Sequence, residues 1–339
     1  FSSFDTWEKD ERRRDTLSDE KIAALQDECD FWRFLQFEFY RELTALKDYA
    51  KSKNVALIGD IPIYVAYDSA DVWAHPEIFR LDKNMRPKEV AGVPPDYFSA
   101  DGQLWGNPLY DWKKQQADGF LWWHHRLLHQ LQFFDKIRID HFRAFESYYA
   151  VPYGATTAKI GRWVKGVGTK IFDGLDLDGR IIAEDLGIIT DKVRRLVKRT
   201  GFPGMKVFQF AFDGRRDNEH LPENVKYNTV YYTGTHDNDT LKGWYDAQGD
   251  GTKEYVKKTL GATDENVFDK AFKRVMRSRA KFVIVPMQDY LLQGSEARMN
   301  TPGTNDGNWK YVLPKNYAKV KNRIRKYVKN RCSDSAART

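Results

Sequence analysis

The sequence predicts an α/β protein of the (β/α)8 TIM-barrel type, with long inserted loops and with six of the eight barrel strands identifiable. Short apolar or β-branched runs begin near residues 55, 136, 180, 205, 229 and 282, and helical segments alternate with them. Three of these runs end in carboxylates, at Asp140, Glu184 and Asp237. The strand ends of a barrel converge on one face, so we expect these acids to share one pocket.

The segment before the first strand is expected to be one helix that begins after the pattern Thr16-x-x-Asp19. Apolar side chains recur in it at steps of three and four residues, at Ile22, Leu25, Cys29, Trp32, Leu35, Phe39, Leu43 and Leu46. This spacing is typical of a helix with one buried face. We therefore expect the stripe to belong to the core and not to a cofactor site.

The first strand is expected at 55–58 and to run on through Asp60. The residues that follow, at about 66–112, are rich in Pro, Gly, Asp and aromatic side chains. This composition is too irregular for a helix, and loops of such length are usually functional. A helix over about 112–134 then leads into the strand at 136–140.

The second half continues the alternation of strands and helices. The strand at 180–183 precedes a helix that Thr190 caps and Gly201 ends. Further strands are expected at 205–210, 229–233 and 282–286. The sequence contains no Gly/Ser-rich linker, so the prediction is a single catalytic domain over residues 1–339, with the loop insertion at about 66–112.

Composition and charge exclude several classes of protein. The chain has 339 residues, 41% of them hydrophobic, which is ample for a globular core. Its 55 basic and 48 acidic residues are interspersed, which argues against a nucleic-acid-binding stripe. The basic stretch Lys319–Arg331 fits an amphipathic terminal helix better. The two cysteines form no disulfide framework, and no apolar run has the roughly 20 residues of a membrane span, so we expect a soluble, cytoplasmic protein.

Two of the carboxylates have the surroundings that glycoside chemistry requires. A retaining enzyme needs one ionised carboxylate to attack the anomeric carbon and one protonated carboxyl to donate to the leaving oxygen. Arg138 precedes Asp140 by two residues on the same strand face, and would keep that carboxylate ionised. The apolar run Ile181-Ile182-Ala183 before Glu184 would supply the desolvation that raises a carboxyl pKa.

Asp237 would bind sugar hydroxyls, with His141 and His236 as hydrogen-bond donors beside the acids. Each acid also has a plainer interpretation as a helix cap or a turn residue, and for any one acid alone this is favoured. Asp185 and Asp239 are interpreted in that way. The helical histidines His124, His125 and His129 lack the Glu of a zinc-protease motif and are interpreted as structural.

Several blocks of the sequence, in order along the chain, resemble the amylomaltase family, the disproportionating enzymes of the α-amylase-like barrel clan. They are Gly59-Asp-Ile-Pro-Ile-Tyr-Val-Ala-Tyr-Asp, Pro94-Pro-Asp-Tyr-Phe-Ser-Ala-Asp-Gly-Gln-Leu-Trp-Gly-Asn-Pro, Arg138-Ile-Asp-His-Phe-Arg, Ala183-Glu-Asp-Leu-Gly, Gly234-Thr-His-Asp-Asn-Asp-Thr and Gly294-Ser-Glu-Ala-Arg-Met-Asn-Thr-Pro-Gly-Thr. The resemblance implies Asp140 as nucleophile, Glu184 as acid/base and Asp237 as transition-state stabiliser. It also implies sugar contacts from Asp60, Asp96, Gln103, Trp105, Asn107, Arg138, His141 and His236, and an aromatic turn with Tyr97 and Phe98 beside the sugar.

The family's activity would be 4-alpha-glucanotransferase activity, which transfers maltooligosaccharyl segments between α-1,4-glucans such as starch and glycogen by a retaining double displacement. The expected partners are maltooligosaccharides, glucose and α-1,4-glucans, without nucleic acid, membrane, cofactor or metal. No oligomeric state is predicted. A hydrolytic α-amylase-like glycosidase and a catalytically weak glucan-binding fragment are the alternatives. Because two barrel strands are not found, we expect a fragment that lacks the family's N-terminal part and is poorly soluble or inactive alone.

Overall fold

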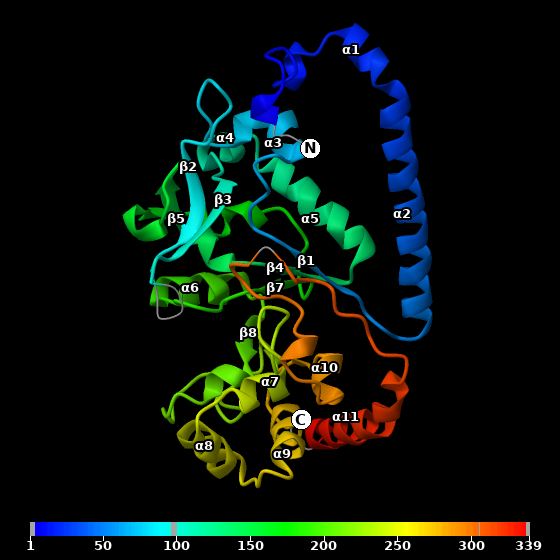
Figure 1. The fold of residues 1–339 in the computed structure, drawn as a ribbon, viewed down its shortest axis with the longest axis vertical. Helices are drawn as coiled ribbons and strands as arrows, with labels where there is room; N and C mark the ends of the chain where they lie inside the picture. Colours follow the sequence, from blue (N-terminus) through cyan, green and yellow to red (C-terminus); the bar gives the residue numbers. More distant parts are fainter. Residues whose placement is uncertain (1–3, 96–99, 305, 337–339) are drawn as a thin grey trace. The chain divides into compact units, whose positions relative to one another are not determined.

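The computed structural model describes residues 4–95, 100–304 and 306–336 (Figure 1). The chain divides into two compact units, unit 1 (Phe1–Phe202) and unit 2 (Pro203–Thr339). Each unit is described by itself below. The single domain over residues 1–339 stays a prediction.

A parallel sheet of three strands in unit 1 has the order β1-β4-β7. Its strands are β1 (Ile58–Ile61), β4 (Lys136–Ile139) and β7 (Ile181–Ala183). The register pairs Asp60 with Arg138, so these two side chains lie beside each other on neighbouring strands. The first strand begins later than the predicted residue 55, while the other two begin within a residue of the predicted positions.

A second parallel sheet, in unit 2, has the order β10-β9-β8. It consists of β8 (Gly204–Val207), β9 (Thr229–Tyr232) and β10 (Phe282–Ile284). The six predicted strands are therefore present and parallel within their sheets. In the described residues they are two fewer than the eight strands of a closed barrel.

Helix α6 (Asp191–Thr200) of unit 1 follows β7 as predicted. The Thr190 side chain accepts a hydrogen bond from the Val193 N–H, and Gly201 ends the helix at φ 70°. This left-handed conformation favours glycine because it carries no Cβ. The predicted start and stop signals are both confirmed.

Unit 2 has its own hydrophobic core. Its helices are α7 (Leu241–Asp246), α8 (Asp250–Leu260), α9 (Val267–Met276), α10 (Met287–Tyr290) and α11 (Lys321–Ala336). The Phe272 ring lies 5.4 Å from the rings of Tyr290 and Tyr327. Because Tyr327 of α11 is buried in this core while most basic residues of α11 are exposed, the predicted amphipathic terminal helix is confirmed.

The predicted loop at 66–112 was wrong over much of its length, because it contains α3 (Ala70–Ala74), β2 (Glu89–Val93) and β3 (Gln103–Pro108). These strands join β5 (Ser147–Pro152) and β6 (Arg162–Lys165) in an antiparallel sheet of order β3-β2-β5-β6. The sequence concealed the strands because β5 and β6, which complete the sheet, lie far along the chain.

The predicted helix over 112–134 is two helices, α4 (Trp112–Ala117) and α5 (Leu121–Phe133). Gly119 and Phe120 between them both have left-handed backbone conformations, with φ values of 73° and 61°. Two consecutive residues of this kind end a right-handed helix. The apolar periodicity continues across the break, which is why the pattern predicted one helix.

The N-terminal helix was also wrong in two respects. It is divided into α1 (Asp19–Ala24) and α2 (Gln26–Ser52), and Ser18, not Thr16, caps α1 by accepting from the Lys21 N–H at 3.2 Å. The stripe predicted to be core is largely exposed, with Trp32 at 51% and Phe39 at 56%. Figure 1 shows α2 at the edge of unit 1. Periodicity predicted a helix with an apolar face but not what covers that face.

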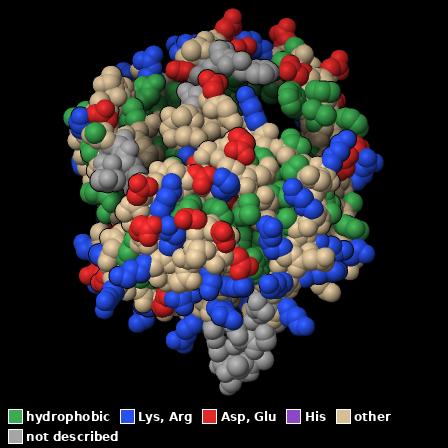
Figure 2. Space-filling view, turned by 60° about the horizontal axis from the view of Figure 1, so that its bottom comes forward, with side chains coloured by type: hydrophobic (Ala, Val, Ile, Leu, Met, Phe, Trp, Pro, Cys, Tyr) green, Lys and Arg blue, Asp and Glu red, His purple; other side chains and the backbone are tan. Residues whose placement is uncertain are grey.

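No helix in the part of the chain that the structure describes is both long enough and apolar enough to cross a membrane. On the face shown in Figure 2, acidic side chains lie among the lysines and arginines. This distribution agrees with the interspersed charges of the sequence.

Candidate active site

Asp140 and Glu184 of unit 1 each follow a strand of the parallel sheet, Asp140 after β4 and Glu184 after β7. The Asp140 N–H donates to the Ile61 carbonyl at 2.9 Å, and the Glu184 N–H donates to the Ile139 carbonyl at 3.1 Å. These bonds extend the ladder by one residue past the strand ends. The two acids are thus brought to the same edge of the sheet, as the sequence predicted.

Arg138 links the first two strands of this sheet through their carboxylates. Its guanidinium donates to both oxygens of Asp60, at 2.9 and 2.6 Å, and its Nη2 lies 3.1 Å from Oδ1 of Asp140. Burial works against the guanidinium charge, but the hydrogen bonds to Asp60 and the charges of both carboxylates raise the Arg138 pKa. The predicted contact between Arg138 and Asp140 is confirmed.

Glu184 is buried and differs from Asp140 in its electrostatic environment. Its Oε2 accepts from the His141 N–H at 2.8 Å, and its Oε1 accepts from the Leu186 N–H at 2.6 Å. Burial, followed by the charge of Asp140, raises the Glu184 pKa to about 8, although the Leu186 N–H and Arg138 oppose the shift. The raised pKa favours the protonated form of Glu184, whereas Asp140 lies beside the Arg138 cation.

The turn after Asp140 gives His141 a left-handed conformation, with φ 48° and ψ 46°, that directs its N–H to Glu184. Such a conformation is uncommon for residues other than glycine and occurs most often at functional sites. Burial and the Arg143 charge lower the imidazole pKa to about 3. The ring is therefore neutral, with one donor and one acceptor nitrogen.

Strand β3 of unit 1 places one aromatic side chain, that of Trp105, beside His141. The Trp105 ring lies edge-on to His141, with centroids 4.8 Å apart, and its Nε1 donates to Oε1 of Gln103 at 3.1 Å. Asn107 donates to the Val65 carbonyl at 2.8 Å. Trp105 is 37% exposed, so part of its ring is open to a ligand.

Three predicted sugar-contacting residues, Asp96, Tyr97 and Phe98, lie outside the described residues. Asp60 is within them, but both of its carboxylate oxygens already accept from Arg138. The site roles of these four residues stay predictions.

Asp237, the third predicted acid, belongs to unit 2 and follows β9 in a loop. Its Oδ1 accepts from Asn300 Nδ2 at 2.6 Å, and its Oδ2 lies 3.4 Å from Nε2 of His236. Its backbone carbonyl accepts from Arg298 at 2.7 Å. The Trp309 ring lies 5.2 Å from the His236 ring. The convergence of Asp237 with the acids of unit 1 stays a prediction.

Sequence reasoning assigned no role to four residues that the structure places around these acids. They are Arg143, Asp289, Arg298 and Asn300. Arg298 and Asn300 belong to the block that begins at Gly294 and resembles the amylomaltase family. That resemblance was the sequence signal that could have identified them. Asp289 is 1% exposed and accepts from the Thr233 hydroxyl at 2.5 Å and from the Leu241 N–H at 2.7 Å. It thereby joins the two ends of the loop that carries Asp237.

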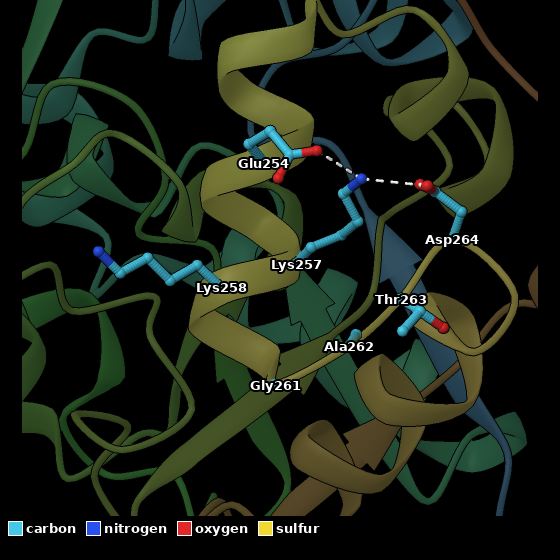
Figure 3. Close-up of a pocket in the computed structure, with 7 residues that line it drawn as sticks. All are labelled: Glu254, Lys257, Lys258, Gly261, Ala262, Thr263 and Asp264. Carbon is cyan, nitrogen blue, oxygen red and sulfur yellow. Dashed lines mark hydrogen bonds and ion pairs between the residues drawn. The ribbon is translucent and has the colours of Figure 1, made fainter.

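A surface pocket elsewhere in unit 2 contains none of the predicted site residues (Figure 3). It lies at the end of α8, where Lys257 pairs with Glu254 at 2.5 Å and with Asp264 at 3.1 Å. These three charged side chains pair with one another, so we assign no catalytic role to this pocket.

Two of the helical histidines of α5, His124 and His129, make structural contacts. Nε2 of His124 lies 3.0 Å from the Ile171 carbonyl, and Nε2 of His129 lies 2.9 Å from the Tyr40 hydroxyl. Among the described residues, no group of three or more His, Cys, Asp or Glu side chains has an arrangement that would hold a metal ion.

Comparison with known proteins relates this fold and its acids to one family. A solved structure of amylomaltase from Streptococcus agalactiae, in complex with acarbose, superposes with a TM-score of 0.92 and 34% identity over 98% of this chain and 69% of that chain. This likeness confirms the predicted barrel fold class.

The chain also matches the family described as 4-alpha-glucanotransferase over residues 1–316. It is 44% identical to the 4-alpha-glucanotransferase of Aquifex aeolicus, over 95% of this chain and 67% of the relative. For the 4-alpha-glucanotransferase of Clostridium butyricum, the identity is 46%, over 92% of this chain and 65% of the relative. The chain therefore spans about two thirds of the length of these relatives. It belongs to the 4-alpha-glucanotransferase family.

Proposed function

We propose that this chain carries the catalytic carboxylates of a retaining 4-alpha-glucanotransferase. The observation that supports this most directly is the pair of neighbouring strand-end acids in opposite environments. Asp140 faces Arg138, whereas the buried Glu184 has its pKa raised to about 8. Two carboxyl groups whose environments separate their protonation states are what glycoside cleavage with retention requires.

In the first step, the Asp140 carboxylate attacks the anomeric carbon of an α-1,4-glucan, and Glu184 donates its proton to the departing 4-oxygen. A glycosyl ester on Asp140 results, and Glu184 becomes a carboxylate. In the second step, Glu184 removes the proton from the 4-hydroxyl of an incoming glucan, which attacks the ester and releases Asp140. Asp237 binds sugar hydroxyls and stabilises the transition state.

Transfer also requires that water be kept from the glycosyl ester. Trp105 stands beside His141 in unit 1, and aromatic rings stack on sugar faces and exclude water. We assign the same role to Tyr97 and Phe98. Phe98→Ala is then expected to raise the ratio of hydrolysis to transfer. An unchanged ratio with a lower overall rate would mean that Phe98 positions the sugar and does not exclude water.

The substrates would be maltooligosaccharide donors and glucose or glucan acceptors, without cofactor or metal, in the cytoplasm. Support comes from the relatives' names and from the acarbose complex of the Streptococcus agalactiae protein. Sugar contacts would come from Asp60, Asp96, Gln103, Asn107, Arg138, His141 and His236.

The decisive experiment is incubation of the chain with maltotriose, followed by analysis of product lengths. Transfer produces glucose together with chains longer than maltotriose. Glucose and maltose without longer chains would assign hydrolysis instead, and binding without turnover would assign a glucan-binding fragment.

A further inference from the structure

Two loops of unit 2 that are distant in sequence run side by side through a series of hydrogen bonds. One is the loop 233–241, which carries Asp237, and the other is the segment 293–300. The bonds join Thr240 Oγ1 to the Gln293 carbonyl at 2.7 Å, Ser295 Oγ to Asp239 Oδ2 at 2.6 Å, Arg298 Nη2 to the Asp237 carbonyl at 2.7 Å and the Asn300 N–H to the His236 carbonyl at 3.1 Å. Residue numbers rise in one loop as they fall in the other, so the contact is antiparallel.

Within this contact, Arg298 and Asn300 act on different parts of Asp237. The Arg298 guanidinium bridges two backbone carbonyls, those of Asp237 and Asn300, the latter at 2.8 Å. These two hydrogen bonds hold the two backbones together. The Asn300 amide instead donates to the Asp237 carboxylate at 2.6 Å.

The Asp237 carboxylate is consequently oriented by a neutral donor. Its other oxygen faces His236 of its own loop at 3.4 Å, and its side chain is 40% exposed. An amide fixes the direction of a carboxylate and leaves its negative charge in place, whereas an arginine would neutralise it. An oriented, charged and accessible carboxylate suits a group that stabilises developing positive charge.

We propose that Asn300 is a positioning residue that aims the Asp237 carboxylate at the bound sugar, and that the segment 293–300 is the clamp that holds Asn300 in place. This inference rests on the proposed function, in which Asp237 stabilises the transition state. It gives the segment 293–300 a role in catalysis. The contacts that support it all lie within unit 2.

The first test is Asn300→Asp, which keeps the shape of the side chain and replaces the donor by a second carboxyl group. We expect kcat for maltotriose transfer to fall about 10- to 100-fold, with KM changed less than about threefold. The loss should grow as pH rises, because two adjacent carboxylates repel each other once both are ionised. The charged or titratable groups that contact the pair in the described residues are His236 and Arg298.

Two further variants separate positioning from a loss of folding. Asn300→Ala should lower kcat by about tenfold with a melting temperature within about 3 °C of the parent, since one hydrogen bond is lost. Asn316→Asp makes the same chemical exchange at an exposed asparagine without a capping bond and should change neither quantity. Retention of kcat within threefold by Asn300→Asp, or a pH profile identical to that of the parent, would overturn the proposal.

A measurement that does not depend on activity keeps the inference separate from the proposed function. If the parent chain shows no transfer, the proposed function fails, and the clamp is judged by amide hydrogen exchange. Asn300→Ala and Arg298→Met should then raise exchange of the peptide covering 234–241 at least about fivefold, relative to Asn316→Asp. Unchanged exchange in both variants would overturn the clamp.

Discussion

The acid pair of unit 1 and the single acid of unit 2 are held in place by different kinds of structure. Asp140 and Glu184 sit on the backbone ladder of buried parallel strands, where Ile137, Ile139 and Ile181 are fully buried. Asp237 sits in a loop that side chains of a distant segment hold. Strand register fixes positions by many cooperative bonds, whereas each side-chain bond contributes only about 1 kcal/mol. The pair should therefore tolerate changes in its neighbours better than Asp237 does.

The two regions also differ in how they use buried carboxyl groups. Glu184 of unit 1 is buried at the proposed reaction centre, with its pKa raised to about 8 by burial and by Asp140. Asp289 of unit 2 is buried beneath the Asp237 loop, with its pKa raised to about 6 mainly by burial. Each carboxyl group accepts two hydrogen bonds, but Glu184 lies at a strand end beside the charge of Asp140, whereas Asp289 joins Thr233 to Leu241.

The largest expected effect is that of Asp140→Asn, which removes the proposed nucleophile and keeps the side-chain shape. Transfer from maltotriose should fall at least about a thousandfold, with the melting temperature nearly unchanged. Asp176→Asn, at an exposed position, is the matched control. Near-normal turnover of Asp140→Asn in the same assay would remove Asp140 from the mechanism.

The next effect tests whether Glu184 donates a proton. A fluoride leaving group needs no protonation, so Glu184→Gln should lose about 100-fold less of the first step with maltosyl fluoride than with maltotriose. The measurement is the rate of fluoride release compared with the rate of glucose release. Equal losses on the two donors would contradict the acid/base role.

The pH dependence of stability tests the burial of Glu184 independently of activity. Because its pKa is raised in the folded state, the folded chain binds this proton more tightly, and the stability contribution is lost as pH rises from about 4.5 to about 8. The unfolding free energy of Glu184→Gln, relative to the parent, should therefore increase by about 2 to 4 kcal/mol between pH 5 and pH 9. Urea unfolding at both values measures it, and a difference independent of pH would show that Glu184 is not desolvated.

Asp289→Ala tests whether Asp289 stabilises the loop 233–241, which carries Asp237. It leaves the buried Thr233 hydroxyl and the Leu241 N–H without their acceptor, so we expect a loss of about 2 to 3 kcal/mol in unfolding free energy. Asp217→Ala, at an exposed aspartate, is the control and should change stability by less than about 0.5 kcal/mol. Equal stabilities of the two variants would mean that Asp289 does not tie the loop ends.

The smallest effect is expected for Asp60→Asn. Asp60 is 43% exposed, and Arg138 keeps Asp140 as a partner, so the cost should be about 1 kcal/mol. If Asp60 acts through Arg138, kcat falls and KM stays constant. A raised KM with unchanged kcat would instead support the predicted sugar contact of Asp60.

Sequence alone predicted the parts of this protein that depend on local patterns. Apolar runs located the six parallel strands, Thr190 and Gly201 marked the ends of α6, and the order Arg138, Asp140 and Glu184 predicted the contacts at the strand ends. Each of these features is set by the residue itself and its near neighbours, through side-chain alternation, capping and the preference of glycine for positive φ.

Tertiary structure decided the features that depend on partners far along the chain. The antiparallel pairing of β2 with β5 converted an expected loop into a sheet, and the apolar face of α2 proved to be exposed. Asn300 reaches Asp237 across 63 residues. Periodicity records which face of an element is apolar, but its partner is chosen by the free energy of packing the whole chain, which no local pattern contains.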